Sequence, residues 1–423
     1  MDKKLWLTRH YTFAEKNRRV LLKELLQTSL QELMEIEVVS KKKEPISTSP
    51  GIVTKIKMSE MEKIGVHTLR EALNHIPGVL VIDGGLGNLI VTIRGVGEVF
   101  NQKVLFLLEG VPYYMTSHSD IPLLGIPVNM IEYIEVIRGP GAVMYGTNAS
   151  AGVINIILKK DNDRSKTKIR GGGNGYSLIN TDIDISIPLG TDGNFYIGTS
   201  MQKYLEGYKV YYPKARVHDH FQNDNLYWYQ KLDGEYISLP TEGSIERIEE
   251  FYDLLFGIKY KNVELFGSAF FQNRTGLGSV LSLYMPLDAR YWGALIHAKY
   301  NFEFDKWQIS PYFDHNIMFI DFFIKNNNHI KGSNGNHDYI IIDDTHWLTN
   351  MTDGYQSFEN PWKNNYRTRF GVNASYNISD NYNILIGLEY ELRSNGRYLL
   401  YDDEKEEILQ VAQPKGTVFE YAT

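Results

Sequence analysis

The hydrophobic and polar positions of this chain follow two different patterns in its two parts. Between about residues 36 and 160, short apolar runs are separated by turns that contain glycine or proline. Thr68 and Glu71 have the spacing of a capping box before LNHI, which predicts a helix that the following Pro-Gly ends. Predicted strands read VLVID, LIVTIRG, KVLFLLEG, EYIEVIRG and GVINIIL, and PVNMIEYI is expected to be helical. This mixture predicts one α+β unit.

After about residue 165 the pattern changes to long segments of period two. TDIDISIPL places Ile183, Ile185 and Ile187 on one face and Asp182, Asp184 and Ser186 on the other. The segments RYWGALIHAKYNFEF, NNYRTRFGVNASYN and YNILIGLEYELR alternate in the same way. Strands of soluble sheets usually have about five or six residues. Strands of about 9 to 11 residues with one apolar and one polar face are typical of a membrane-spanning barrel with a wet interior.

The connections between these predicted strands are alternately short and long. The short ones are GTDG, Lys261-Asn262, Asp305-Lys306 and ISDN, and the long ones cover residues 207–249, 274–289 and 324–364. Short turns on one side and long loops on the other are typical of an outer-membrane barrel. A soluble β-sandwich or propeller is the alternative, but polar loops of this length are poorly explained there.

Composition narrows the classes of protein further. The chain has 423 residues, of which 43% are hydrophobic, so it is expected to fold. It has no cysteine, which excludes disulfides and thiolate sites, and a net charge of -7, which argues against nucleic acid as a partner. No window has 18 consecutive apolar residues, so no helical membrane span is predicted. The first thirty residues lack the apolar stretch of a secretory signal, which we expect to lie upstream.

Motifs for catalysis or cofactor binding are not found. Gly141 and Gly146 have the spacing of a phosphate-binding loop, but the required lysine is replaced by Thr147. HExxH and GxSxG are absent, and His218-Asp219-His220 lies in a long polar loop without a carboxylate at ligand spacing. We therefore predict no catalytic residue, no metal site and no cofactor.

The first part resembles a known family in several blocks that occur in order. MEIEVVS, TLREALNHIPGV, VTIRG, VLFLLEGVP and IEYIEVIRGPGAVMYGTNASAGVINIILK are similar to the plug domain of TonB-dependent outer-membrane receptors. The second part resembles this family in pattern only. In the family, a plug lies inside a barrel of about 22 strands and gates the uptake of scarce nutrients such as ferric siderophores. The resemblance implies a Gram-negative outer membrane as the location.

The expected organisation is a leader at residues 1–35, a plug at 36–160 and antiparallel transmembrane β-barrel strands at 161–423. The second part supplies nine convincing strands and the start of a tenth in GTVFEYAT, which is too few to enclose a plug. We therefore expect an incomplete barrel from a truncated receptor. A complete, smaller barrel is the alternative.

The resemblance implies a partner-binding segment, the TonB box, which would add as an extra strand to a TonB-type periplasmic energy-coupling protein. Its residues are Glu35, Ile36, Glu37, Val38, Val39 and Ser40. The other implied partners are outer-membrane lipid and a small nutrient ligand such as a ferric siderophore.

The resemblance also implies an ionic lock between the plug and the barrel wall. Arg94 and Arg138 each lie in an I-R-G tripeptide, and a guanidinium inside a barrel must be paired. Glu389 and Glu391, on a predicted strand face, are the candidate partners. The alternative is that these arginines pair only within the plug.

Two further groups of site residues are expected. Small residues between the last two plug strands would let the backbone lie close to the barrel wall, where a Cβ would clash, and Asn148 and Asn155 would bond locally to the turn. This plug loop contains Gly139, Gly141, Tyr145, Gly146, Asn148, Gly152 and Asn155. Candidate ligand residues in the long loops are Tyr208, Tyr211, Tyr212, Trp228, Trp347 and Trp362, whose chemistry suits siderophores, haem, cobalamin or glycans equally.

Three functional hypotheses follow. The first is an energy-coupled, gated transporter in which the protein supplies binding and gating but no chemistry. The second is a non-transporting surface receptor or adhesin on the same barrel. The third is a soluble β-rich enzyme or scaffold.

Overall fold

The computed structural model describes the chain in segments that form two compact units. Unit 1 comprises Met1–Val81, Val91–Tyr113 and Pro127–Asp161, and unit 2 comprises Ile82–Ile90, Tyr114–Ile126 and Asn162–Thr423. The described residues are 37–39, 43–45, 52–84, 87–98, 100–116, 119–139, 148–159, 166–173, 178–204, 208–212, 243–276, 287–325, 330–331, 338–341, 347–349, 355–359, 365–379, 382–395, 398–402, 407–412 and 418–422.

Unit 1 is built on a five-stranded mixed sheet with the order β3-β8-β9-β6-β7. The strands are β3 (Ile52–Lys57), β6 (Val104–Leu108), β7 (Val111–Pro112), β8 (Ile131–Arg138) and β9 (Gly152–Leu158). Strand β9 lies between β8, its antiparallel neighbour, and β6, its parallel neighbour. All residues of β6 and β9 are buried, as expected for apolar runs at the centre of a sheet.

Two short helices, α3 (Met58–Lys63) and α4 (Leu69–Asn74), also belong to this unit. The predicted helix start is confirmed, because Thr68 and Glu71 form a reciprocal capping box at the first turn of α4. The prediction of a helix over PVNMIEYI is wrong. Only a 3-10 turn, η3 (Val128–Met130), forms there, because the β-branched residues from Ile131 onward pair with β9 and are buried as strand β8.

Glycine at the start of β9 is required by its neighbours within unit 1. A Cβ on Gly152 would lie 2.4 Å from the Ile137 carbonyl oxygen and 2.8 Å from Ile93 Cδ1. The crowding at this position therefore comes from strands of the same unit, whereas the sequence analysis attributed it to the barrel wall. Gly139 (φ +113°) and Asn148 (φ +64°) take up left-handed backbone at the two ends of the loop.

The other predicted loop residues have different outcomes. Gly141, Tyr145 and Gly146 lie outside the described residues. The expectation that Asn155 bonds locally in the turn is wrong, because Asn155 lies within β9. Its Oδ1 accepts from the Gly110 backbone N–H at 3.0 Å and its Nδ2 donates to Glu135 at 3.1 Å, so it joins three neighbouring chain segments.

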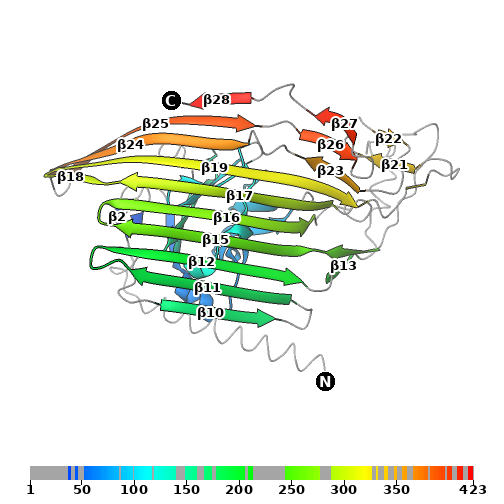
Figure 1. Ribbon diagram of the computed structural model, residues 1–423, viewed down its shortest axis with the longest axis horizontal. Coiled ribbons are helices and arrows are strands. Elements are labelled where there is room, and N and C mark those ends of the chain that lie inside the picture. The colour runs from blue at the N-terminus through cyan, green and yellow to red at the C-terminus, as the bar shows by residue number, and fades with distance from the viewer. Residues whose placement is uncertain are drawn as a thin grey trace, which may run out of the picture. The chain divides into compact units, whose positions relative to one another are not determined.

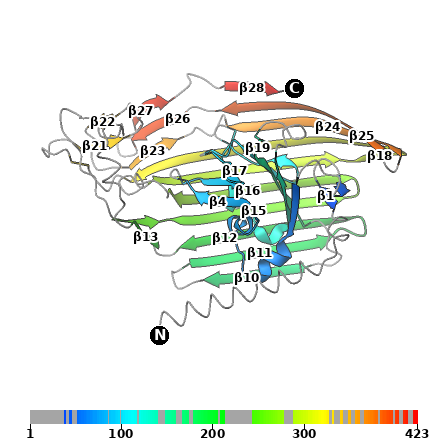
Figure 2. The ribbon, with the colours of Figure 1, turned by 180° about the vertical axis from the view of Figure 1, so that it is seen from behind.

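Unit 2 is dominated by one antiparallel sheet of long strands (Figures 1 and 2). In the order of the chain, each of the following pairs with the next: β10 (Lys166–Gly173), β11 (Leu178–Pro188), β12 (Gly193–Tyr204), β15 (Glu249–Tyr260), β16 (Val263–Thr275), β17 (Leu287–Tyr300), β19 (Trp307–Lys325), β24 (Tyr366–Ser379) and β25 (Tyr382–Asn395). Within the described residues this sheet does not close on itself: β10 forms one edge, and β27 and β28 lie at the other end.

Shorter strands extend this sheet or form small sheets beside it. The extensions are β18 (Phe302–Phe304), β23 (Tyr355–Glu359), β26 (Tyr398–Asp402), β27 (Glu407–Ala412) and β28 (Val418–Ala422). The small sheets pair β13 (Tyr208–Tyr212) with β14 (Gly243–Arg247), and β20 (Ile330–Lys331) and β22 (Trp347–Thr349) with β21 (Asp338–Ile341).

In the long sheet, polar side chains are buried and apolar side chains are exposed, which is the reverse of the distribution in a soluble protein. Along β12, Asn194, Ser200 and Gln202 are buried, and on β25 Ile386 and Leu388 are 53% and 70% exposed. A contiguous exposed face of this kind suits lipid, because hydrocarbon solvates apolar side chains and the polar face is turned inward. The predicted fold class, an α+β plug followed by antiparallel membrane-type strands in an incomplete barrel, is confirmed. None of the helices in the described ranges is long and apolar enough to cross a membrane.

Candidate functional site

Two segments from the N-terminal part of the chain belong to unit 2 and lie on the buried face of its long strands. Residues 82–90 contain the end of β4 (Val79–Asp83) and the start of β5 (Leu89–Ile93), and residues 114–126 contain the 3-10 turn η2 (Leu123–Gly125). Both segments approach the sheet without room for another atom. A Cβ on Gly87 would lie 2.7 Å from Ala289 Cβ, and one on Gly125 would lie 2.6 Å from Phe270 Cγ.

Arg274 ties the first segment to the sheet. This residue lies on β16 and is only 2% exposed. Its guanidinium bonds the Asp83 carboxylate, donates to the Gly87 carbonyl at 3.1 Å, and donates to Glu249 of β15 at 3.2 and 3.3 Å. One buried cation therefore holds two carboxylates and one backbone oxygen, which fixes the turn against two strands.

A buried carboxyl group links the two segments to each other. Asn88 Nδ2 of the first segment donates to Asp120 Oδ1 of the second at 3.2 Å, and Asp120 is 2% exposed. Burial raises the pKa of the Asp120 carboxyl to about 7, and the hydrogen bond from Asn88 lowers it in part. The Asp120 carboxyl in this link therefore changes its protonation state near neutral pH.

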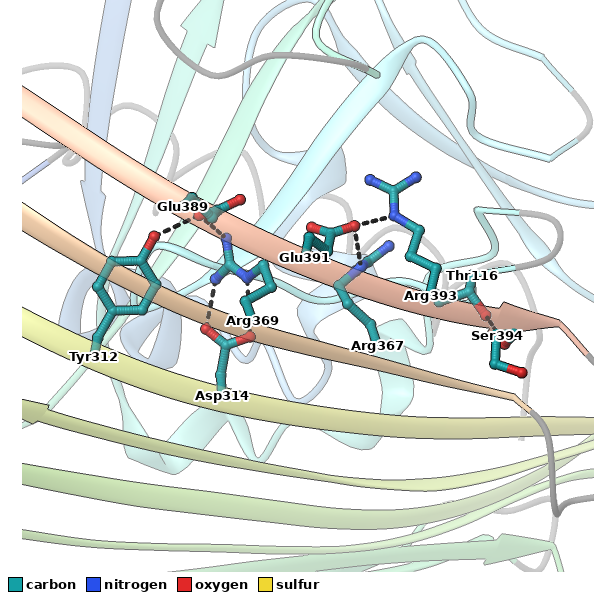
Figure 3. Close-up of polar contacts among 9 residues, drawn as sticks. All are labelled: Thr116, Tyr312, Asp314, Arg367, Arg369, Glu389, Glu391, Arg393 and Ser394. Carbon is teal, nitrogen blue, oxygen red and sulfur yellow. Dashed lines mark hydrogen bonds and ion pairs between the residues drawn. The ribbon is translucent and has the colours of Figure 1, made fainter. Parts of the chain in front are cut away.

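Farther along the sheet, a ladder of polar side chains crosses four strands. Figure 3 shows its members on β19, β24 and β25. His297 of β17 and Arg369 of β24 lie opposite Asp314 of β19 in the two strand registers. Arg369 donates to both Asp314 oxygens at 2.9 and 2.7 Å and to Glu389 of β25 at 3.0 Å. Tyr312 donates its hydroxyl hydrogen to the same Glu389 oxygen. The arginine in the centre of this ladder is satisfied by two carboxylates.

A second arginine lies two residues earlier on the same strand. Arg367 is completely buried, with its guanidinium carbon 4.0 Å from the centre of the Tyr114 ring. Its Nε lies 3.4 Å from a Glu391 oxygen that Arg393 also contacts. Beside this group, Thr116 Oγ1 donates to the Ser394 carbonyl at 3.5 Å (Figure 3). The 114–126 segment therefore covers a patch of charged side chains.

The predicted lock residues lie in different surroundings. Glu389 is 40% exposed at its side chain and is engaged by Arg369 and Tyr312. Arg94 (φ +53°) and Arg138 lie near Gly78 of unit 1, and no ion pair between described residues involves either of them. Burial, and then the nearby charge of Arg94, lower the pKa of Arg138 from its usual value. The pairing of these arginines with Glu389 stays a prediction.

The remaining predicted site residues are described only as backbone or not at all. Glu37, Val38 and Val39 form β1, which pairs antiparallel with β2 (Lys43–Pro45). Tyr208, Tyr211 and Tyr212 lie in β13 and Trp347 in β22. Glu35, Ile36, Ser40, Trp228 and Trp362 lie outside the described residues, as does the His218–His220 segment.

Several residues of this site were missed by the sequence analysis. They are Tyr114, Arg274, Asp314, Arg367 and Arg369. Arg367 and Arg369 carry a signal that could have been used, because they stand two apart in a period-two strand and must share its polar face. For metal binding, a search of the described residues finds no group of three or more His, Asp or Glu side chains placed to hold an ion.

Comparison with known proteins identifies the first part of the chain. A family model, TonB-dependent Receptor Plug Domain, matches residues 45–153. The vitamin B12 transporter BtuB of Vibrio vulnificus (strain CMCP6) is 28% identical over 187 residues, which are 44% of this chain and 30% of that protein. The iron-regulated outer membrane virulence protein of Vibrio cholerae serotype O1 is 36% identical over 125 residues, which are 27% of this chain and 18% of that protein.

Solved structures agree on the fold. The pyoverdine outer membrane receptor FpvA of Pseudomonas aeruginosa PAO1 matches 90% of this chain and 53% of its own, with a TM-score of 0.55 and 12% identity. The chain thus aligns with about half of that receptor and with a third or less of the two relatives. The homologues of this family are outer-membrane β-barrel proteins of Gram-negative bacteria, and the lipid-type face of the long sheet agrees with that location.

Replacing Arg274 with Met should release the 82–90 segment. The change removes the cation that bonds the buried Glu249 and the half-buried Asp83, and breaking a buried pair costs about 3–5 kcal/mol. Hydrogen exchange measured by mass spectrometry should therefore become faster in residues 82–90 and in the facing parts of β15 and β16. Lys203→Met is the control, since Lys203 pairs with Glu250 at 3.1 Å but is 49% exposed, so its loss should have little effect. Equal effects of the two variants would contradict the role of Arg274.

The Asp120 carboxyl should make the 114–126 segment sensitive to pH. Because its pKa is raised from 3.8 to about 7 in the folded protein, its stabilising contribution is complete below pH 3.8 and is lost as the pH rises through 7. Protection of the segment against hydrogen exchange, corrected for the intrinsic exchange rate, should decrease between about pH 6 and 8. In Asp120→Asn this decrease should disappear. A wild-type segment with constant protection would show that Asp120 does not titrate there.

Proposed function

We propose that this chain serves energy-coupled uptake of a scarce nutrient through the outer membrane. The reason is that it carries the plug domain of a TonB-dependent receptor together with long membrane-type strands. One observation carries the proposal. The segments 82–90 and 114–126 fall within the range matched by the plug family model and are held on the polar face of those strands by Arg274 and the Arg367 patch. A ligand bound at these segments would contact both the plug segments, which would act as the gate, and the long strands, which form the wall.

A ferric siderophore is the proposed ligand class. The related proteins are, by name, an iron-regulated outer membrane virulence protein, a pyoverdine receptor and a vitamin B12 transporter. The buried face of the sheet carries Arg367, whose nitrogens have no hydrogen bonds, and a guanidinium group suits the oxygen-rich anionic groups that chelate ferric iron. Vitamin B12 is the second candidate, and growth of a deletion strain on a panel of iron sources and on B12 separates the two.

The proposed mechanism uses binding and gating without chemical change of the solute. The ligand binds where 82–90 and 114–126 meet the wall, and the TonB box is then taken up as an added strand by a TonB-type periplasmic protein. The exposed apolar face of the long sheet contacts outer-membrane lipid. Aromatic residues of the long loops, including Trp228 and Trp362, would provide the first contact with the solute.

Accumulation of radiolabelled ferric siderophore before and after collapse of the proton-motive force tests this function. Energy-coupled transport requires that accumulation stop while surface binding continues. Accumulation that persists would exclude a TonB-dependent mechanism. Binding with no accumulation in either state would favour the alternative, a non-transporting surface receptor or adhesin.

Replacing Val38 with Pro should uncouple transport from binding. Proline removes one backbone donor from β1, the strand that would pair with the coupling protein, and it fixes φ. Uptake should fall to the level of a strain without the coupling protein, while ligand binding at the cell surface remains unchanged. The control is Val38→Thr, which keeps the backbone donor and the β-branched side chain. Parallel loss of binding and uptake would indicate a folding defect.

The plug lock is proposed as a second gating element, with Arg138 and Arg94 on the plug and Glu389 on the wall. Arg138→Met removes the charge and keeps much of the length of the side chain, so the plug should become looser. The measurements are hydrogen exchange in β8 and β9 and the sensitivity of cells to large antibiotics. Glu389→Gln should recover part of the loss only if Glu389 is the partner, because the orphaned charge is then gone. If the effects of the two substitutions simply add, Glu389 is not the partner of Arg138 and belongs only to the network of Arg369.

A further inference from the structure

The guanidinium group of Arg367 is enclosed by protein but lacks hydrogen-bond partners. Its side chain is 1% exposed, and none of its three nitrogens has a hydrogen bond. The nearest carboxylate oxygen, on Glu391, is 3.4 Å from Nε and is shared with Arg393. Two guanidinium groups therefore approach the same Glu391 carboxylate, and Arg367 contacts it only as an ion pair. Buried N–H groups without hydrogen bonds are costly, so a complementary group is expected.

The neighbouring arginine shows what is missing. Arg369 is on the same strand and the same face, and its register places Asp314 on one side and Glu391 on the other. The register of Arg367 places the neutral Asn316 on one side and the cationic Arg393 on the other. Arg369 makes two hydrogen bonds to Asp314 and one to Glu389, whereas Arg367 makes none.

The surroundings of Arg367 define what its missing partner would be. The Tyr114 ring covers one face of the guanidinium at 4.0 Å, a contact that uses none of the N–H groups. The Nη1 and Nη2 edge is left, and such an edge matches two oxygens of one carboxylate or phosphate group. The missing partner would therefore be an oxyanion held by this guanidinium edge.

We propose that Arg367, under the Tyr114 ring, is an oxyanion site that binds a carboxylate of the transported solute. The proposal rests on the function proposed above and specifies the chemistry of its ligand. A solute is favoured over a lipid headgroup because Arg367 is on the buried face of the sheet, whereas the lipid-type face carries Phe370 and Leu388, 53% and 70% exposed. Since Tyr114 and Thr116 cover the patch, occupancy is coupled to the position of the 114–126 segment.

The test uses the full-length protein in detergent, with thermal unfolding followed at constant ionic strength. Sodium acetate and sodium phosphate are the probes, chloride replaces them in the reference, and acetamide is the neutral analogue of acetate. The expected result is saturable stabilisation by the oxyanions and none by acetamide. Arg367→Gln should weaken oxyanion binding about ten- to a hundredfold, as expected for loss of charge-assisted hydrogen bonds. Arg367→Lys should weaken it less, because it keeps the charge and loses the bidentate edge.

Lys203→Gln makes the same change of charge at an exposed position and should leave oxyanion binding unchanged. The proposal is overturned if the oxyanions stabilise wild type and Arg367→Gln equally, or if neither binds saturably, which would assign the free N–H groups to buried water. Stabilisation by lipid A micelles alone would also overturn it, since the occupant would then be a headgroup.

This experiment is independent of energy coupling. If oxyanions bind through Arg367 but accumulation does not depend on the proton-motive force, the proposed transport function fails and the site stands. If accumulation is energy-coupled and Arg367→Gln changes neither oxyanion binding nor uptake, the site fails and the function stands.

Discussion

Charge on the buried face of the long sheet must be neutralised by neighbours, because that face is screened from bulk water and its opposite face is apolar. The structure meets this requirement in two ways. Some charges are paired between adjacent strands, as Asp314 is with Arg369. Others are paired by groups from the 82–90 and 114–126 segments, as Arg274 is by Asp83 and the Gly87 carbonyl. The position of those segments on the sheet is therefore set by electrostatics as much as by packing.

This constraint also relates the two compact units to function. The sheet of unit 1 is conventional, with apolar strands at its centre and polar exceptions such as Asn155 and Glu135 bonded to each other. The β4–β5 connection and the 114–126 segment belong to unit 2 instead. Elements that move during gating are drawn from the less stable parts of a protein. A buried carboxyl that titrates near neutral pH lies in the 114–126 segment, and Arg367, whose guanidinium lacks hydrogen bonds, lies on β24 under Tyr114 of the same segment.

Much of the fold could be predicted from local signals. The period-two segments predicted the long strands, and the residues Ile384, Ile386 and Leu388 are exposed together as that pattern requires. The capping box predicted the start of α4. The failures occurred where long-range pairing decides the structure. PVNMIEYI has helical spacing, but Ile131 and Ile134 are drawn into β8 by β9, which follows more than a dozen residues later.

The site was predicted less well, for the same physical reason. Arg369 and Asp314 are 55 residues apart in the chain and 2.7 Å apart at their nearest atoms, and only strand register brings them together. Arg274 meets Gly87 across an even larger interval, 187 residues. A polar face can be read from one strand, but its partners depend on how the strands are aligned. Residues such as Arg94 and Arg138 were predicted in another way, because their tripeptides resemble those of a family. That resemblance does not depend on how the strands are aligned.

The contact between Gly125 and Phe270 has a consequence for the variation of this protein among its relatives. A methyl group on residue 125 would lie 2.6 Å from the Phe270 Cγ and 2.7 Å from its Cβ, so a larger residue there requires glycine at position 270. Gly87 is different, because its φ is +74° and a Cβ there would lie 2.9 Å from the Arg274 carbonyl oxygen, so no change at position 289 makes room for it. Position 125 should therefore change only together with position 270, and position 87 should stay glycine in related sequences. A fixed glycine at 87 and coupled substitutions at 125 and 270 would thus record, without any coordinates, that these turns are seated on the wall.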